Sequence, residues 1–289
     1  MQKKHFITYG TNNFKLQQKE LLFLVKKSGV FNTTHGYKPE NLDINFKNKY
    51  QEILRQSRGG GYWIWKYKIL QQKLNEINFN DILVYFDSGG SFNLGGKHML
   101  EKYFEILNQS QHSLLQFRMN HLIEKNYTTK EIFEYFNVSN DFEIKNTGQH
   151  MGGLLFIKKT NDILEYLNLY ENCIEYDPFL ITDKYNKKQN NSKFIENRHD
   201  QSIFSVLSKK YGAEVVDGDP TYFSDKPSMQ FHYPFLAVRR KKITKFEKII
   251  LWPKFYFGLS NTTFFKYKYS NLERIIYKIS IKLYTKLYK

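Results

Sequence analysis

Residues 80–90, NDILVYFDSGG, decide the fold of this chain. Residues 82–86 are consecutive apolar or aromatic residues, and a run of this length is typical of a strand covered on both faces. Asp87 follows at the carboxyl end of this strand, which is the end where open α/β sheets bind ligands. Asp87, Ser88 and Gly89 are therefore candidate binding residues. The alternative is a plain turn, because Asp-Ser-Gly-Gly is favourable turn chemistry.

The segments on either side alternate between predicted strands and helices. Strands are expected at residues 4–9 and 152–158, and helices at 62–74, 129–136 and 200–211. This alternation predicts an α/β fold with a Rossmann-like, mainly parallel sheet flanked by helices. A turn closes the first strand, and its candidates for ligand contact are Thr8, Gly10 and Thr11.

A segment of glycines and aromatic residues, RGGGYWIWK at residues 58–66, precedes the central strand. Glycine lets the backbone approach a ligand, aromatic rings offer stacking faces, and the flanking arginine and lysine bring positive charge. This combination indicates contact with a small polar ligand. A glycine turn beside core tryptophans is the alternative. The candidates in this segment are Arg58, Gly61, Tyr62, Trp65 and Lys66.

The composition is that of a globular protein. Of the 289 residues, 41% are hydrophobic and 17% aromatic, enough to bury a substantial core. The single Cys173 excludes a disulfide framework within the chain and fits a reducing compartment. The N-terminal sequence MQKKHFITYGTNN lacks the apolar run of a signal peptide, and no segment has the roughly 18 uninterrupted apolar residues of a membrane span. We therefore expect a cytoplasmic protein.

Positive charge is concentrated near the C-terminus. Residues 237–289 contain 14 lysines and arginines against Glu247 and Glu273, which makes +12 of the formal net charge of +16. A strongly basic segment suits an anionic membrane, a nucleic acid or simple solubility. This asymmetry predicts two parts, a nearly ordinary domain at residues 1–236 and a basic extension at 237–289.

The basic extension ends in an amphipathic pattern. Ser270 and Glu273 form a capping-box signature, and the residues that follow place lysines beside an apolar stripe. We favour a helix over a strand because of this cap. A basic amphipathic helix suits an anionic membrane surface, and it could equally pack on the domain as its last helix. The apolar stripe consists of Leu272, Ile276, Ile279, Leu283 and Leu287.

Four motifs follow one another along the chain: RGxGYWxWK at residues 58–66, the strand ending in Asp87, QHxGG at 149–153 and RHDQS at 198–202. In this order they resemble bacterial polysaccharide-biosynthesis glycosyltransferases of the GT-A fold, over about residues 4–235. The resemblance implies a hexosyltransferase of capsule or lipopolysaccharide biosynthesis, with a nucleoside diphosphate sugar as donor, which we expect to be a UDP-hexose. The implied acceptor is a surface polysaccharide or a lipid-linked glycan, so we expect the enzyme to be peripheral on the inner face of the cell membrane.

The resemblance also carries an expectation about metal. In that family an Asp-x-Asp motif follows the strand and holds a divalent cation together with the nucleotide sugar. The matching triplet here is Asp87-Ser88-Gly89, in which glycine replaces the second acid. The implied ligands of Mn²⁺ or Mg²⁺ are Asp87, the diphosphate, water and His232, which matches a late histidine of the family.

The remaining implied residues lie around the sugar. Asp200 would act as a base or orienting group beside donor and acceptor, next to His199, and Asp87 would be the second catalytic acid. Gly152 and Gly153 would let the sugar approach the backbone. The structural alternatives are a helix cap for Asp200 and a bulge for the two glycines.

Two other functions stay open at this stage. The basic extension suits a nucleic-acid-binding protein, which would give the Asp87 triplet no role. The missing second acid suits an inactive glycosyltransferase-like scaffold. Under the leading hypothesis we expect a nucleotide-sugar donor, a glycan acceptor and an anionic membrane surface as partners, and no nucleic acid.

Overall fold

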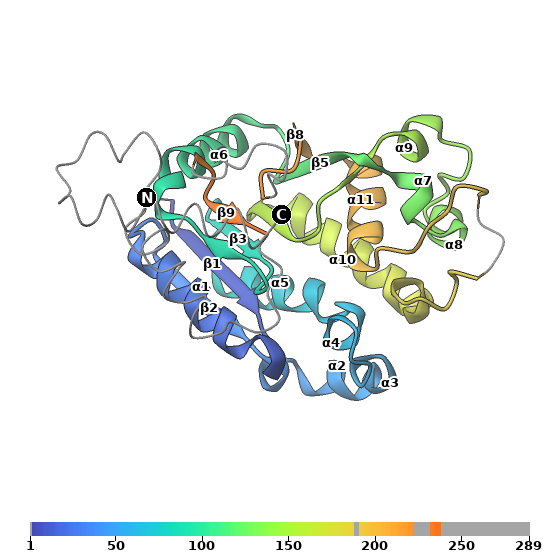
Figure 1. The fold of residues 1–289 in the computed structure, drawn as a ribbon, viewed down its shortest axis with the longest axis horizontal. Helices are drawn as coiled ribbons and strands as arrows, with labels where there is room; N and C mark the ends of the chain where they lie inside the picture. The colour runs from blue at the N-terminus through green and yellow to red at the C-terminus, as the bar shows by residue number, and fades with distance from the viewer. Residues whose placement is uncertain (1, 188–190, 222–231, 238–289) are drawn as a thin grey trace, which may run out of the picture. The chain divides into compact units, whose positions relative to one another are not determined.

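The computed structural model describes residues 2–187, 191–221 and 232–237 of the 289-residue chain. The chain divides into two compact units (Figure 1). Unit 1 consists of Met1–Lys3, Tyr37–Tyr85 and Ile106–Asp219, and unit 2 of Lys4–Gly36, Phe86–Glu105 and Pro220–Lys289. Residues 238–289, nearly all of the predicted basic extension, lie outside the described residues.

Unit 1 is built on a sheet whose strands are β3 Ile82–Phe86, β5 Leu114–Ile123, β6 Gly148–His150, β7 Leu154–Lys158 and β8 Glu214–Asp217. Their order is β3–β7–β5–β6, and β8 pairs with β5. All of β3 is buried, as its unbroken apolar run predicted. The strand expected at residues 152–158 is confirmed as β7, although it begins two residues later.

The helices of unit 1 are α2 Ile44–Lys49, α3 Gln51–Leu54, α4 Gly59–Tyr62, α5 Trp65–Glu76, α7 Glu124–Tyr127, α8 Lys130–Tyr135, α9 Phe142–Asn146, α10 Asn161–Tyr176 and α11 Asp200–Tyr211, with 3-10 turns η2 Pro39–Asn41 and η4 Pro178–Ile181. α8 and α11 confirm the predicted helices at 129–136 and 200–211. The helix predicted at 62–74 begins instead at Trp65, because the backbone of Tyr62 and Trp63 is left-handed.

Aromatic side chains lock three helices of unit 1 together. Tyr67 of α5 packs on Tyr170 of α10 with ring centroids 5.2 Å apart, and Tyr170 packs on Phe204 of α11 at 4.5 Å. The Tyr166 hydroxyl donates to the Phe204 carbonyl oxygen at 3.0 Å. Burial of each ring stabilises the fold by roughly 2–3 kcal/mol. These contacts fix the axis of α11 and thereby the place of its first residue, Asp200.

The elements wholly or mostly in unit 2 are β1 Lys4–Tyr9, β2 Thr33–Tyr37, η1 Asn12–Phe14, α1 Lys15–Lys27, β4 Ser91–Phe92, η3 Leu94–Gly96, α6 Lys97–Gln109 and β9 Phe235–Leu236. β1 confirms the strand expected at residues 4–9. β4 and β9 pair antiparallel, with Phe92 opposite Phe235. The Phe235 ring lies 4.9 Å from that of Phe86 and 6.1 Å from that of Phe6, so β9 adds an aromatic centre to this unit.

The predicted fold class is confirmed. The chain is α/β, with a mainly parallel central sheet flanked by helices. β5 is a local exception, since it runs antiparallel to β6 and β7 and parallel to β8. Among the described residues, no helix has both the length and the apolar character needed to cross a bilayer.

Candidate functional site

Three of the sequence motifs meet at one buried ion pair in unit 1. The Lys66 Nζ donates to Asp200 Oδ2 at 2.5 Å and to the Gly152 carbonyl oxygen at 3.0 Å. The side chains of Lys66 and Asp200 are only 2% and 7% exposed, and the ammonium lies 4.9 Å from the centre of the Tyr85 ring. A buried charge without a partner is strongly destabilising. The pair therefore ties α5, the turn before β7 and the start of α11 to one another.

Gly152 is explained by the close approach of α11. A Cβ at this position would lie 3.0 Å from Gln201 Cα and 3.2 Å from Asp200 Oδ2. The Gly152 N–H also faces Gln201 Oε1 at 3.4 Å. Absence of a side chain at residue 152 thus lets the first turn of α11 reach the QHxGG segment, and the half-buried Gly153 follows it directly.

The glycine-aromatic segment forms a left-handed turn. Five successive residues have positive φ angles, and a Cβ at Gly61 would lie 2.8 Å from Leu54 Cα. The Trp65 indole N–H donates to the Gly59 carbonyl oxygen at 3.0 Å and closes the segment. The left-handed region suits glycine and strains bulky residues. The φ angles are 60° for Gly59, 59° for Gly60, 97° for Gly61, 51° for Tyr62 and 58° for Trp63.

Asp183 contacts both the glycine-aromatic segment and His199, the residue before α11. Its carboxylate accepts hydrogen bonds from Arg58 Nη1 at 2.8 Å, from the Tyr62 hydroxyl at 3.2 Å and from His199 Nε2 at 3.1 Å. The His199 ring stacks on Trp63 with centroids 5.3 Å apart and lies 5.2 Å from Tyr62. We call Arg58, Tyr62, Trp63, Asp183 and His199 the Asp183 cluster.

Charge in the Asp183 cluster is set by burial and by mutual contact. Burial lowers the pKa of His199 below its ordinary value, against the opposing effect of Asp183, so the imidazole is neutral at pH 7 and donates from Nε2. Burial alone would raise the pKa of Asp183, but the hydrogen bond from His199 and the charge of Arg58 outweigh it and lower that pKa. Burial and the neighbouring Asp183 raise the pKa of Tyr62. At neutral pH the cluster is an ionised carboxylate among proton donors.

Both cations expected to neutralise a diphosphate already contact carboxylates. Arg58 bonds to Asp183 and lies 3.3 Å from Glu196 through Nη2, and Lys66 bonds to Asp200. Arg58 is 45% exposed, so its pairs are open to exchange with an anionic ligand, whereas Lys66 is enclosed. The geometry makes Lys66 an orienting partner of Asp200.

The start of α11 differs from the capping alternative. His199 is the residue that precedes the first turn, with φ 56° and ψ −123°, and no side-chain capping bond is formed there. Asn197 instead donates from Nδ2 to the Leu180 and Thr182 carbonyl oxygens at 2.8 and 3.0 Å. The Asn197 N–H, which Asp200 would accept in a capping box, instead donates to Asn186 Oδ1 at 3.0 Å, and the Asp200 carboxylate contacts Lys66.

The other predicted residues lie in unit 2, where two turns both contact Phe14. The Asp87 carbonyl oxygen accepts from the Gly90 N–H at 3.0 Å, so the turn expected from Asp-Ser-Gly-Gly is formed. A Cβ at Gly89 would lie 3.4 Å from Phe14 Cε1, and the Phe14 N–H donates to the Thr11 carbonyl oxygen at 2.9 Å. The two turns of unit 2 thus meet at Phe14.

Thr8, Ser88 and Gly10 complete the unit 2 group. Thr8 is fully buried, and its Oγ1 has no hydrogen-bond partner among the described residues. Ser88 is buried as well. A Cβ at Gly10 would lie 2.9 Å from Gln18 Cδ, the far end of a flexible side chain. These positions combine small residues with one buried hydroxyl that has no hydrogen-bond partner in the described part of the chain.

The predicted metal ligands do not form a protein site by themselves. Within the described ranges, no group of three or more histidine, cysteine, aspartate or glutamate side chains is placed to hold a metal ion. Asp87 and His232 would supply two ligands, while Mg²⁺ requires six oxygen-rich positions, many of them from water or phosphate. We therefore derive no catalytic step through a metal.

Two contact residues were missed by the sequence patterns, whereas Trp63 belongs to the RGxGYWxWK motif, whose aromatic rings were expected to stack on a ligand. Asp183 and Glu196 flank a polar loop whose sequence has no periodic pattern, and neither carries a local signal. Their role follows only from the fold, which brings them to Arg58.

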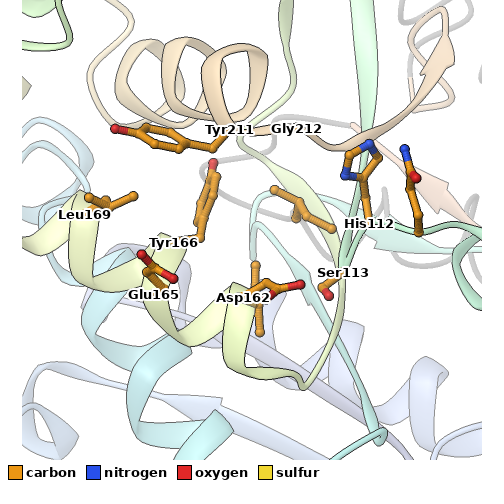
Figure 2. A pocket seen from close by; sticks show the side chains of 11 residues that line it. His112, Ser113, Asp162, Glu165, Tyr166, Leu169, Tyr211 and Gly212 are labelled. Atoms are coloured by element: carbon orange, nitrogen blue, oxygen red, sulfur yellow. The ribbon is translucent and has the colours of Figure 1, made fainter.

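A separate hollow of about 240 Å³ lies at the other end of α11 in unit 1 (Figure 2). Its lining includes His112, Asp162, Glu165, Tyr166 and Tyr211. Asp200 and Tyr211 are the first and last residues of α11, roughly 16 Å apart at 1.5 Å per residue. The two carboxylates would repel a diphosphate, and sites for larger ligands measure about 300–1,000 Å³. This hollow contains no predicted site residue and does not suit a nucleotide sugar.

No family model and no curated protein matches this sequence. Among solved structures, a glycosyltransferase involved in the glycosylation of the major capsid of PBCV-1 has a TM-score of 0.49 and 12% identity, over 81% of this chain and 91% of that one. Mouse xyloside xylosyltransferase 1 has a TM-score of 0.37 and 11% identity, over 76% and 86% of the two chains. Galactosyltransferase LgtC in complex with donor and acceptor sugar analogs has a TM-score of 0.39 and 9% identity, over 84% and 81%. Because these TM-scores are below 0.5, we draw nothing from them about the activity of this chain.

Proposed function

We propose that this chain is a glycosyltransferase that moves a sugar from a nucleoside diphosphate sugar, a UDP-hexose, to a surface polysaccharide or lipid-linked glycan. The observation that carries the proposal is the meeting of three motif segments at Lys66, Gly152 and Asp200. Their sequence resembles glycosyltransferases of polysaccharide biosynthesis. The strained backbone beside this pair adds support, because strained residues gather at functional sites.

We assign Asp200 to contact with the acceptor or with the transferred sugar. Transfer breaks the bond between the anomeric carbon and the diphosphate oxygen, forms a bond from the acceptor oxygen to that carbon, and releases the acceptor hydroxyl proton. A carboxylate within hydrogen-bond reach of that hydroxyl takes the proton or orients the group. Lys66 holds Asp200 Oδ2 at 2.5 Å and would fix the orientation of this carboxylate.

The nucleotide contacts are assigned from the sequence resemblance alone, without reference to how the two units are placed. Asp87 would bind a ribose hydroxyl, while Ser88, Gly89 and the turn at Gly10 and Thr11 would let the backbone approach the donor. The buried Thr8 Oγ1, which lacks a hydrogen-bond partner in the described part of the chain, is a further polar contact for it. If Mn²⁺ or Mg²⁺ takes part, Asp87, His232 and diphosphate oxygens would hold it.

A thermal-shift panel tests the proposed function. The intact chain is heated with UDP, GDP, ADP and the corresponding nucleotide sugars, each with and without Mn²⁺. Binding to the folded state raises the melting temperature. At a ligand concentration of 100 Kd, the free energy of unfolding increases by about 2.7 kcal/mol. We expect a UDP compound to give the largest shift. The absence of a shift with every nucleotide would contradict the proposal.

We place the enzyme in the cytoplasm at an anionic membrane surface, through residues 238–289. This segment lies outside the described residues, so the support is its sequence, a concentration of lysines beside an apolar stripe. Deleting residues 271–289 should weaken binding to vesicles containing anionic lipid, and binding of the full chain should fall as salt rises. Vesicle binding that survives the deletion would contradict this location.

A further inference from the structure

Backbone strain is concentrated at a single place in unit 1. In the described ranges, the non-glycine residues with positive φ are Tyr62, Trp63, Asn80, Asn137 and His199. Asparagine tolerates the left-handed region, whereas bulky side chains do not. The three bulky residues are the ones whose rings contact one another, His199 with Trp63 and with Tyr62. Such backbone is unfavourable, so surrounding contacts have to offset it.

Asp183 supplies the polar contacts at this place. A carboxylate is an acceptor with about four lone-pair positions, so it can receive all three donors at once. The donors come from Arg58, Tyr62 and His199, at 2.8, 3.2 and 3.1 Å. An asparagine could not reproduce this, because its amide nitrogen would face donors.

Asp183 is itself held in register with the start of α11. Asn197 has no exposed surface, and its side chain donates to the carbonyl oxygens of Leu180 and Thr182. Thr182 precedes Asp183, and Asn197 stands two residues before His199. The segments 180–183 and 197–199 are therefore fixed to each other by the side-chain bonds of Asn197 as well as by the Asp183–His199 bond.

We propose that Asp183 is a positioning residue for Asp200. It holds the imidazole of His199, the residue directly before Asp200, and so maintains the positive φ from which α11 starts. Because α11 starts in this way, the Asp200 carboxylate points at Lys66. It thereby keeps the orientation that sugar transfer requires. The proposal rests on the proposed function in one respect, that Asp200 acts on the sugar.

The kinetic test compares three variants of the full chain. Asp183→Asn should lower kcat of sugar transfer by about 100-fold, the effect of a displacement near 1 Å, and leave KM for the donor within about twofold. Glu196→Gln is the matched control, since Glu196 contacts Arg58 but has no bond to His199. Its kcat should fall far less than that of Asp183→Asn, because the Asp183–His199 bond is kept. Asp183→Glu, which keeps the carboxylate, should recover part of the loss. Equal kcat in wild type and Asp183→Asn would overturn the proposal.

A structural readout separates this proposal from the proposed function. Should the wild-type chain transfer no sugar, the proposed function fails, and a crystal structure of Asp183→Asn still decides the positioning role. We expect His199 to leave positive φ and the Lys66 Nζ to Asp200 Oδ2 distance to exceed 3.5 Å, beyond a hydrogen bond. Unchanged geometry at both places would overturn the proposal.

A measurement on the wild-type chain covers the case in which the variant does not fold. Nitrogen-15 NMR of the histidine rings at pH 7 should find His199 neutral with its proton on Nε2, the nitrogen that faces Asp183. A proton on Nδ1, or a ring that exchanges rapidly between orientations, would overturn the proposal.

Discussion

The described residues of unit 1 include two buried lysine–carboxylate pairs with similar distances and burial. Lys66 and Asp200 are 2.5 Å apart, with side chains 2% and 7% exposed, and Lys209 and Glu124 are 2.8 Å apart, with side chains 7% and 0% exposed. Neither residue of the second pair has a positive φ angle. Glu124 also accepts hydrogen bonds from Thr128, Gln149 and Ser205.

The difference lies in the backbone beside each pair. Glu124 begins α7, and its N–H donates to the Thr147 carbonyl oxygen at 2.9 Å. Asp200 follows His199, whose φ is 56°, and faces a turn in which Tyr62 and Trp63 are also left-handed. A pair that serves only stability needs no such strain. Under the proposed function, Lys209 and Glu124 hold the fold, while the strain beside Lys66 and Asp200 serves sugar transfer.

The largest expected effect comes from neutralising one acid of each pair. Asp200→Asn should lower sugar transfer by at least about 100-fold and retain nucleotide binding, because a general base or orienting group contributes about 10²–10⁴-fold. Glu124→Gln should instead lower the free energy of unfolding by about 3–5 kcal/mol, the effect of breaking a buried pair, while kcat per folded molecule persists. Transfer assays and urea unfolding of both variants measure the two effects.

The contrast between the pairs would be lost in one case. If Asp200→Asn changed only stability and Glu124→Gln removed transfer, the functional carboxylate would be Glu124, which has no left-handed residue beside it. The strain beside Asp200 would then carry no functional meaning.

A smaller effect is expected from replacing Gly152, and a smaller one still from replacing Gly89. Gly152→Ala should cost roughly 1–3 kcal/mol of stability and lower transfer, because the new Cβ would lie 3.0 Å from Gln201 Cα and 3.2 Å from Asp200 Oδ2. Gly89→Ala meets only Phe14 Cε1, at an ordinary 3.4 Å, and should leave stability nearly unchanged. Thermal unfolding of both variants is the measurement. Equal melting temperatures would show that α11 does not press on Gly152.

The smallest effect is a pH dependence of stability near the second pair. Burial, with the charges of Lys209 and Arg118, lowers the pKa of His150 to about 3. The unfolded chain binds this proton below about pH 6.5, so the stability is complete above that pH and is lost as pH falls toward 3. The slope from one histidine is at most about 1.4 kcal/mol per pH unit. His150→Gln should reduce the slope between pH 6.5 and 5 in urea unfolding.

Local patterns were sufficient for the elements whose surroundings are uniform. The unbroken run at 82–86 specified a fully buried strand, and helical spacing located α8 and α11. The motif order also marked residues that the fold brings together, since Lys66, Gly152 and Asp200 are far apart in sequence and in contact in unit 1. Whether the assigned roles of these residues are correct stays a prediction.

Other features could not be inferred because they depend on distant contacts. Helical spacing extended α5 back to Tyr62, but the glycines before it adopt left-handed backbone that only the fold selects. Arg58 and Lys66 were expected to face a diphosphate, and the acids that pair with them come from residues more than a hundred positions later. Asp183 has no signal in its own neighbourhood.

The most direct test of glycosyl transfer is the release of nucleoside diphosphate by the purified full chain. Wild type and Asp200→Asn are incubated with UDP-glucose, UDP-galactose and UDP-N-acetylglucosamine, in the presence of glycan acceptors and with or without Mn²⁺. We predict that wild type releases UDP from at least one donor, faster when acceptor is added, and that Asp200→Asn releases it at least about 100-fold more slowly. Equal release by the two proteins, or no release from any donor under any condition, would contradict the assignment of transfer to the site around Lys66 and Asp200.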